Sequence, residues 1–151
     1  MVGAFEGDLI RPLGLVTLYA AYAEGEIDEL LAALPAPEPF NDVKRQWQIG
    51  RKLAYARRLI HRMNASELSG LQATLKDATA LFKKRNDLVH GRLFSGGRLI
   101  SNRTNVPARQ VSADDILELA ERIFHWKEQL WMHRCKHLLP LLSTLRVDSD
   151  A

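Results

Sequence analysis

Apolar side chains recur every three or four residues over the first quarter of this chain, which is the spacing of one face of an α-helix. The pattern begins near Leu9 and continues to Leu34. It stops at PAPEP (35–39), because proline has no backbone N–H with which to continue a helix. So long an amphipathic helix must bury its apolar face against other elements. That face carries Leu13, Val16, Ala20, Ala23, Ile27, Leu30 and Leu34.

Three further segments show helical periodicity, at about 41–63, 66–90 and 112–145. Between the last two of these, RLFSGGRLIS (92–101) places two short apolar runs around Ser-Gly-Gly, which predicts a small β-hairpin or a tight loop. We therefore expect an all-α fold. Residues 1–151 would form a single helical domain, a four-helix bundle with a short β-hairpin or loop insertion between helices three and four.

Several residues at the expected helix ends have the chemistry of caps. Asn41 is a favourable N-cap for the second helix. Ser112, followed three residues later by Asp115, resembles a capping box at the start of the last helix. We expect Gly91 to close the third helix in the left-handed conformation. Pro140 is expected to kink or break the last helix.

Charge is distributed unevenly along the chain. Residues 1–40 hold one basic and seven acidic side chains, residues 41–110 hold fifteen and four, and residues 111–151 hold five and seven. A strongly positive middle is typical of a surface that binds a polyanion, because neutralised phosphates release their counterions. The same excess also fits a solvated basic face that meets acidic faces on neighbouring helices or on a partner protein.

Three features of the sequence bear on where the protein works. A single cysteine, Cys135, excludes an internal disulfide and fits a reducing compartment. No apolar run reaches the length of a bilayer-spanning helix. The start, MVGAFEGDLIRPLG, has acidic residues where a signal peptide has positive charge. We expect an intracellular, cytoplasmic protein that makes no membrane contact.

The stretch KKRNDLVHG (83–91) brings cationic, amide and imidazole groups to the end of the third helix. On a helix, Asn86 and His90 lie one turn apart on one face, whereas Arg85 lies roughly 140° around the axis from His90. A single regular helix therefore cannot stack the guanidinium on the imidazole. Three arrangements would bring them together: Arg85 swings its side chain around, the helix unwinds near Gly91, or a second copy of the chain supplies the partner.

These groups suit the cleavage of RNA. Histidine titrates near neutral pH, so it can take the proton of a 2′-hydroxyl or protonate the leaving 5′-oxygen. Arginine offers parallel donors to phosphate oxygens and stabilises the charge that develops in the transition state. Asn86 would orient the imidazole or donate to the phosphate. The scheme requires no metal ion and no other cofactor.

The string RNDLVHG (85–91) resembles the signature of the HEPN superfamily, in which an arginine, commonly followed by a polar residue such as asparagine, precedes a histidine by four to six intervening residues. Arg85, Asn86 and His90 match that pattern. The resemblance covers this motif and the helical plan, and it implies a metal-independent endoribonuclease that acts as a homodimer. Such enzymes often belong to toxin–antitoxin, abortive-infection or antiphage systems, which implies an antitoxin or other regulatory protein as a further partner.

One branch of that family carries a tyrosine two residues after the histidine, and a partner nucleotidyltransferase modifies it. Arg92 occupies this position here, so we expect no such modification. We assign His90 as the general acid or base, Arg85 as the group that stabilises the phosphate and Asn86 as the orienting group. The residues expected to contact the RNA backbone, from their proximity in sequence, are Lys83, Lys84, Arg92 and Arg98.

Two alternatives stay open. Some HEPN members have lost catalysis and serve as RNA-binding or protein-interaction modules, and here the basic second helix would hold RNA or an acidic partner. In the other, His90 and the cations before it simply complement the dipole at a helix C-terminus that Gly91 ends. The basic side of the second helix would carry Lys44, Arg45, Arg51, Lys52, Arg57, Arg58 and Arg62.

The last helix holds a second candidate site, WMHRCKH (131–137). His133 and His137 lie one turn apart, but Cys135 points elsewhere and no third ligand shares their face, so we expect no metal site. This helix is apolar on more than one side, which indicates either core packing or a second face buried in an oligomer. Its large apolar residues are Phe124, Trp126, Trp131 and Met132. Trp47 is expected to serve packing.

Overall fold

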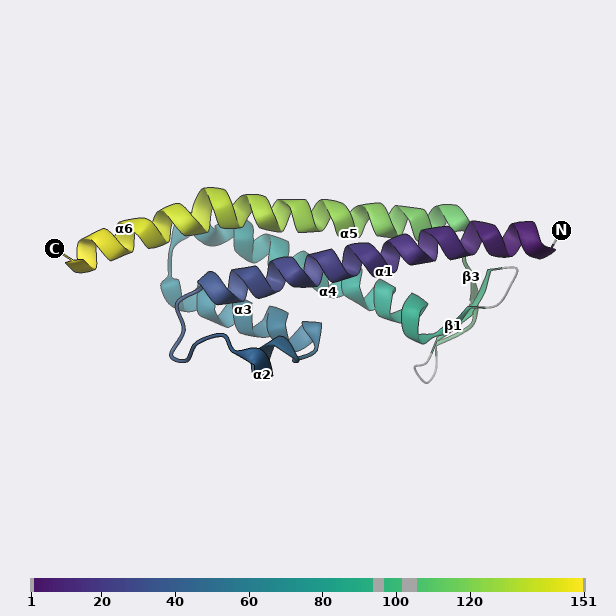
Figure 1. Cartoon of the computed structure of the whole chain (residues 1–151), viewed down its shortest axis with the longest axis horizontal. Coiled ribbons are helices and arrows are strands. Elements are labelled where there is room, and N and C mark those ends of the chain that lie inside the picture. Colours follow the sequence, from purple (N-terminus) through teal and green to yellow (C-terminus); the bar gives the residue numbers. More distant parts are fainter. Residues whose placement is uncertain (1, 94–96, 102–105, 151) are drawn as a thin grey trace. The chain divides into compact units, whose positions relative to one another are not determined.

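The computed structural model of this chain describes residues 2–93, 97–101 and 106–150, which are mostly helical. A small antiparallel sheet is inserted between α4 and α5, so the predicted all-α class with a β insertion is confirmed (Figure 1). Within these residues no helix is both long enough and apolar enough to cross a bilayer. The helices are α1 (Val2–Ala33), α2 (Asp42–Arg45), α3 (Ile49–Met63), the 3₁₀ turn η1 (Ser66–Leu68), α4 (Ser69–His90), α5 (Ala113–His133), the π-helical segment η2 (Arg134–Leu138) and α6 (Leu139–Asp150).

The chain forms two compact units, each assembled from segments that are distant in sequence. The first unit comprises Met1–Ala23 and Ala80–His125, and the second comprises Glu24–Thr79 and Trp126–Ala151. Helices α1, α4 and α5 each run from one unit into the other. The motif at the end of α4 therefore belongs to the first unit, whereas the basic helix α3 belongs to the second.

The core of the first unit is formed by the predicted apolar face of α1 together with α4, the sheet and α5. Val16 and Ala20 of α1 are fully buried, which confirms the helical periodicity found in the sequence. Phe82 and Leu88 of α4 and Leu99 of the sheet are also buried. From α5 the core takes Ile116, Ala120 and Ile123. Burying this apolar surface is the main force that holds the motif-bearing end of α4 in place.

The inserted sheet has the order β1 (Arg92–Leu93), β2 (Arg98–Ile100) and β3 (Arg109–Gln110), all antiparallel. The predicted hairpin corresponds to the pairing of β1 with β2, although two residues of the Ser-Gly-Gly turn lie outside the described ranges. The sequence did not predict β3, because two residues in a polar connector carry no alternating pattern. Gly97 has φ +83°, and a Cβ there would come within 2.1 Å of the Val111 carbonyl oxygen, so this position needs glycine.

The second unit buries the other half of the same α1 face. Ile27 and Leu30 are fully buried, and they share a core with apolar residues of α3, α4 and α5. The buried indole of Trp126 donates from Nε1 to the Thr74 carbonyl at 2.7 Å, which satisfies its only polar atom. The hydroxyl of Thr74 in turn donates to the Gly70 carbonyl at 3.0 Å. Trp126 and Thr74 of this core thus find their hydrogen-bond partners within the unit.

The second predicted helix is interrupted and its charged face is smaller than expected. Asn41 caps α2, since its Oδ1 accepts from the Lys44 N–H at 3.0 Å, but the helix ends after Arg45 and a new one starts at Ile49. Lys44 and Lys52 are buried, so the prediction that both lie on the exposed basic side is wrong. The two ammonium groups bind acidic side chains and, for Lys44, a backbone carbonyl that lie outside the helix.

The last helix changes its hydrogen bonding just before Pro140. The Leu139 N–H donates to the Arg134 carbonyl, so residues 134–138 form a π-helical turn rather than an α-helical one. Proline at 140 cannot donate to a carbonyl of the preceding turn, and the wider turn accommodates that missing donor. Pro140 does not break the last helix, because α6 contains it and continues to Asp150, and the change in hydrogen bonding is confined to the π segment before it.

The start of α5 has the predicted capping box. The Asp115 N–H donates to Ser112 Oγ and the Ser112 N–H donates to an Asp115 carboxylate oxygen, both at 3.1 Å. These bonds from the Ser112 backbone and side chain lower the pKa of Asp115. Ser112→Ala is expected to destabilise the fold by about 1 kcal/mol and to move that pKa back toward its ordinary value. Urea unfolding and a carboxyl NMR titration measure the two effects, and an unchanged Asp115 titration would contradict the expectation.

Candidate active site

Helix α4 stays regular through the whole RNDLVHG motif. Its last residue is His90, and the Gly91 N–H still donates to the Asp87 carbonyl at 3.1 Å, the helical i to i−4 pattern. Unwinding near Gly91 is therefore not how Arg85 could reach His90. The regular helix keeps the Cβ atoms of these two residues roughly 140° apart around the axis.

The expectation that Gly91 adopts a left-handed conformation is wrong. Among the glycines that the structure describes, only Gly97 has a positive φ. Gly91 is needed for a steric reason instead. A Cβ at this position would lie 2.4 Å from the Asp87 carbonyl oxygen and 2.7 Å from that of Ile100. The end of α4 and strand β2 thus approach each other at a point where only glycine fits, which fixes His90 next to the sheet.

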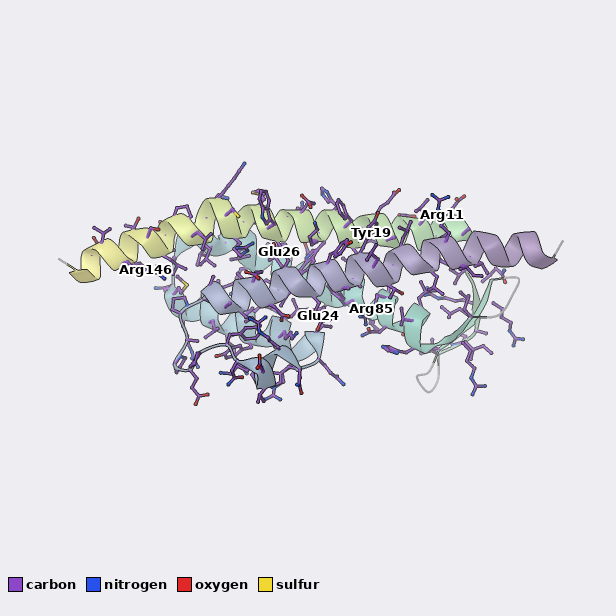
Figure 2. All side chains as sticks on the ribbon, viewed as in Figure 1. Arg11, Tyr19, Glu24, Glu26, Arg85 and Arg146 are labelled. Carbon is purple, nitrogen blue, oxygen red and sulfur yellow. The ribbon has the colours of Figure 1, made fainter. Side chains whose placement is uncertain are left out.

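Arg85, labelled in Figure 2, forms a hydrogen-bonded pair with Asn86 on α4. Arg85 Nη1 donates to Asn86 Oδ1 at 2.6 Å, and both side chains are half-buried. Arg85 Nε is buried and finds no hydrogen-bond partner among the described residues. Asn86 therefore orients the guanidinium in this chain, and the rest of that guanidinium still has donors to offer to a ligand.

His90 is exposed at the C-terminal end of α4. From helical geometry it shares one side of α4 with Asn86 and Lys83, within about 60° around the axis. Lys83 is also exposed. Leu88, on a different side, is buried and anchors this turn of the helix to the core. The imidazole is thus presented outward from a fixed backbone, as a group that exchanges protons with a substrate requires.

The sheet places Arg92 and Arg98 on one exposed face. Arg92 pairs with Ile100 across β1 and β2, and Arg98 lies two residues before Ile100 on the same strand. Side chains two residues apart on a strand share a face, so the two arginines are diagonal neighbours at roughly 7–8 Å. Leu99 points to the opposite face and is buried. Of the predicted RNA contacts, these two lie together immediately after His90 in the chain.

Lys84 lines a hollow of about 300 Å³ beside α4, β3 and the start of α5. Arg109 and Arg122 add positive charge there, and Asp115 and Glu118 add negative charge. Sequence reasoning did not group these residues, because the other charged members lie far from Lys84 along the chain. From helical geometry, Lys84 lies about 100° from Lys83, so the two lysines of the motif face different parts of the first unit.

In the described part of the chain, no third potential metal ligand joins the histidine pair of the second unit. The rings of His133 and His137 are 5.2 Å apart, and the described residues hold no group of three or more potential metal ligands. A Cβ at residue 70 would meet the His133 ring at 2.7 Å, so the imidazole packs on bare backbone at Gly70. Burial, and then the neighbouring His137, lower the pKa of His133. Its neutral form therefore serves packing.

Comparison of the chain with protein-family models, with curated proteins and with solved structures finds no match. The function must therefore be argued from the side chains themselves.

Proposed function

We propose that this chain is a metal-independent endoribonuclease of the HEPN type, in which His90 transfers protons and Arg85 binds the scissile phosphate. The observation that carries the proposal is the Arg85–Asn86 hydrogen bond one turn before an exposed histidine on a rigid helix end. The pair holds a planar donor group, and the histidine supplies a proton acceptor. The diagonal arginines of the sheet add positive charge beside them.

The reaction needs no nucleophile from outside the RNA. The imidazole of His90 accepts the proton of a 2′-hydroxyl, and the 2′-oxygen attacks the adjacent phosphorus. The bond between phosphorus and the 5′-oxygen then breaks, and the leaving oxygen takes a proton from a second imidazole or from water. The products end in a 2′,3′-cyclic phosphate and a 5′-hydroxyl. Arg85 donates to the non-bridging oxygens as they gain charge.

The proposed enzyme is a homodimer with composite sites. Within one chain, Arg85 and His90 leave α4 roughly 140° apart around the axis, and the Arg85 guanidinium is held by Asn86. A two-fold axis beside the end of α4 would bring Arg85 of one copy to His90 of the other. The assembly of two copies thus supplies what one helix lacks. From the same resemblance, we propose that the enzyme acts in a toxin–antitoxin or antiphage system and that a partner protein neutralises it.

Digestion of single-stranded RNA by the purified protein in EDTA tests the reaction type. We expect cleavage to proceed, with cyclic-phosphate ends detected by mass spectrometry. The control substrate carries one 2′-deoxy nucleotide at the major cut site and should resist cleavage there. Cleavage that requires a divalent ion, or that occurs beside the 2′-deoxy nucleotide, would contradict this mechanism. An absence of cleavage in any buffer would contradict the enzyme itself.

A further inference from the structure

Helix α3 has basic residues on its exposed side and no acidic residue along its length. Lys52 differs from these residues because its side chain points into the protein. It is 1% exposed, and its ammonium group contacts Glu24 at 3.0 Å and Asp28 at 2.8 Å. The acidic residues of α1 thus neutralise the one cation of α3 that points inward. The exposed basic residues of α3 are Arg51, Arg57, Arg58, His61 and Arg62.

Two of the exposed arginines of this helix contact aromatic rings instead of carboxylates. The guanidinium carbon of Arg51 lies over the Trp47 ring, 3.8 Å from its centroid, and that of Arg58 lies 5.7 Å from the Tyr55 centroid. Trp47 and Tyr55 meet edge to face at 5.4 Å. Over the described ranges, no ion pair neutralises Arg51, Arg58 or any other exposed arginine of α3. Trp47 is half-buried, so part of its ring is open to solvent.

Helical geometry aligns three of these arginines. Arg51, Arg58 and Arg62 lie within about 40° around the axis and span roughly 16 Å along it. Beside them, a hollow of about 420 Å³ is lined by Arg57, Arg58, His61, Arg62, Ala54 and Gln72. Gln72 Nε2 donates to the Arg57 carbonyl at 3.0 Å, which ties the wall of the hollow to α4. The result is a continuous cationic track with planar groups at one end.

Such a track destabilises the isolated helix, because like charges four residues apart repel. A binding partner that neutralises them accounts for their presence. A bilayer surface fits poorly, since the apolar side of α3 is already buried through Leu53, Leu59 and Ile60 and cannot enter a membrane. Aromatic rings and guanidinium planes next to unneutralised cations are the combination that binds single-stranded nucleic acid, by base stacking and phosphate contacts.

We infer that the surface formed by Trp47, Arg51, Tyr55, Arg58 and Arg62, the α3 track, binds single-stranded RNA. Bases stack on the Arg51–Trp47 pair and on Tyr55, while phosphates contact Arg58 and Arg62. The choice of RNA over DNA rests on the proposed ribonuclease function, whereas the single-strand specificity rests on the rings. The track serves to hold substrate and contributes no group to the cleavage step.

Fluorescence anisotropy with a labelled 20-nucleotide oligouridylate tests the track. The tested protein carries His90→Ala, which keeps the RNA intact whether or not the chain is a nuclease. Adding Arg58→Glu and Arg62→Glu is expected to weaken binding at least tenfold and to flatten the salt dependence by about 1.4 in log–log slope. Arg11→Glu with Lys76→Glu makes the same charge change at exposed positions elsewhere and should alter binding less than twofold.

A second variant separates stacking from charge. Trp47→Ala is expected to weaken binding roughly tenfold, and Trp47→Phe to retain most of it, with melting curves confirming that both are folded. Equal binding by the track variants and the matched control would overturn the track while leaving the nuclease proposal standing. Tight binding that depends on the α3 track, without any RNA cleavage by the wild-type protein, would overturn the nuclease proposal and leave the α3 track standing. Insensitivity to Trp47→Ala, with equal displacement by polyglutamate, would assign the surface to an acidic protein and overturn the RNA inference.

Discussion

Alanine in place of His90 is expected to slow RNA cleavage by about 10²- to 10⁴-fold, the usual contribution of a positioned general acid or base. His90 is exposed at the end of α4, so its truncation removes no buried contact. The free energy of unfolding should change by less than about 0.5 kcal/mol. Single-turnover cleavage of end-labelled RNA in EDTA, together with urea unfolding of the same preparations, measures both quantities.

His125→Ala is the matched control, because His125 is also an exposed histidine of the first unit, on α5. It should leave the cleavage rate unchanged. Arg85→Ala is expected to reduce the rate comparably to His90→Ala, and Arg85→Lys to restore only part of it, since lysine lacks the parallel donors. Cleavage at the wild-type rate by both His90→Ala and Arg85→Ala would show that these residues do not carry the reaction.

Mixed dimers test whether each site combines two chains. When Arg85→Ala and His90→Ala proteins are unfolded together and refolded as a mixture, half of the dimers contain one chain of each kind. In such a dimer one composite site has both groups and the other has neither, so about a quarter of the wild-type activity should return. No recovery would mean that arginine and histidine act within one chain, which the regular α4 geometry would then have to accommodate.

The helical part of this structure was predictable because it follows from local patterns. The buried positions Val16, Ala20, Ile27 and Leu30 are those that three- and four-residue spacing selects. The capping box at Ser112 is equally local, since donor and acceptor are three residues apart. These features depend only on neighbouring residues, so no knowledge of the tertiary fold was needed to predict them.

Features that depend on distant partners were missed. Nothing near Lys52 in the sequence indicates that Glu24 and Asp28 will bury it, because those residues lie on another helix. Strand β3 exists through its pairing with β2 and has no pattern of its own. Gly91 was correctly identified as special but for the wrong reason, since its close neighbour Ile100 comes from β2. In the candidate site, likewise, the motif was evident and the surrounding hollow was not.

Loss of the Lys52 ammonium group is expected to destabilise the fold strongly. Lys52 is 1% exposed, and it contacts Glu24 at 3.0 Å and Asp28 at 2.8 Å (Glu24 is labelled on α1 in Figure 2). Lys52→Met fills much of the same volume but leaves two carboxylates beside an apolar group. Breaking a buried pair by removing one partner costs about 3–5 kcal/mol. Because Glu24 is 35% exposed, we expect a loss near the lower limit, about 3 kcal/mol by urea unfolding at pH 7.

Arg58→Met is the matched control, because Arg58 is an exposed cation of the same helix; its loss should be within about 0.5 kcal/mol. Adding Glu24→Gln and Asp28→Asn to Lys52→Met should restore part of the stability, since the uncompensated charges are gone.

Burial alone would lower the pKa of Lys52, but the hydrogen bonds and charges of Asp28 and Glu24 outweigh it, so the pKa is raised. With a raised pKa in the folded state, the ion pair contributes fully below about pH 10.4, the pKa of lysine in an unfolded chain, and its contribution disappears as the pH rises through the folded value. The stability difference between wild type and Lys52→Met should therefore be constant from pH 6 to 9 and shrink in strongly alkaline solution. A difference at pH 7 no larger than that of Arg58→Met would mean that the buried lysine does not hold α3 to α1.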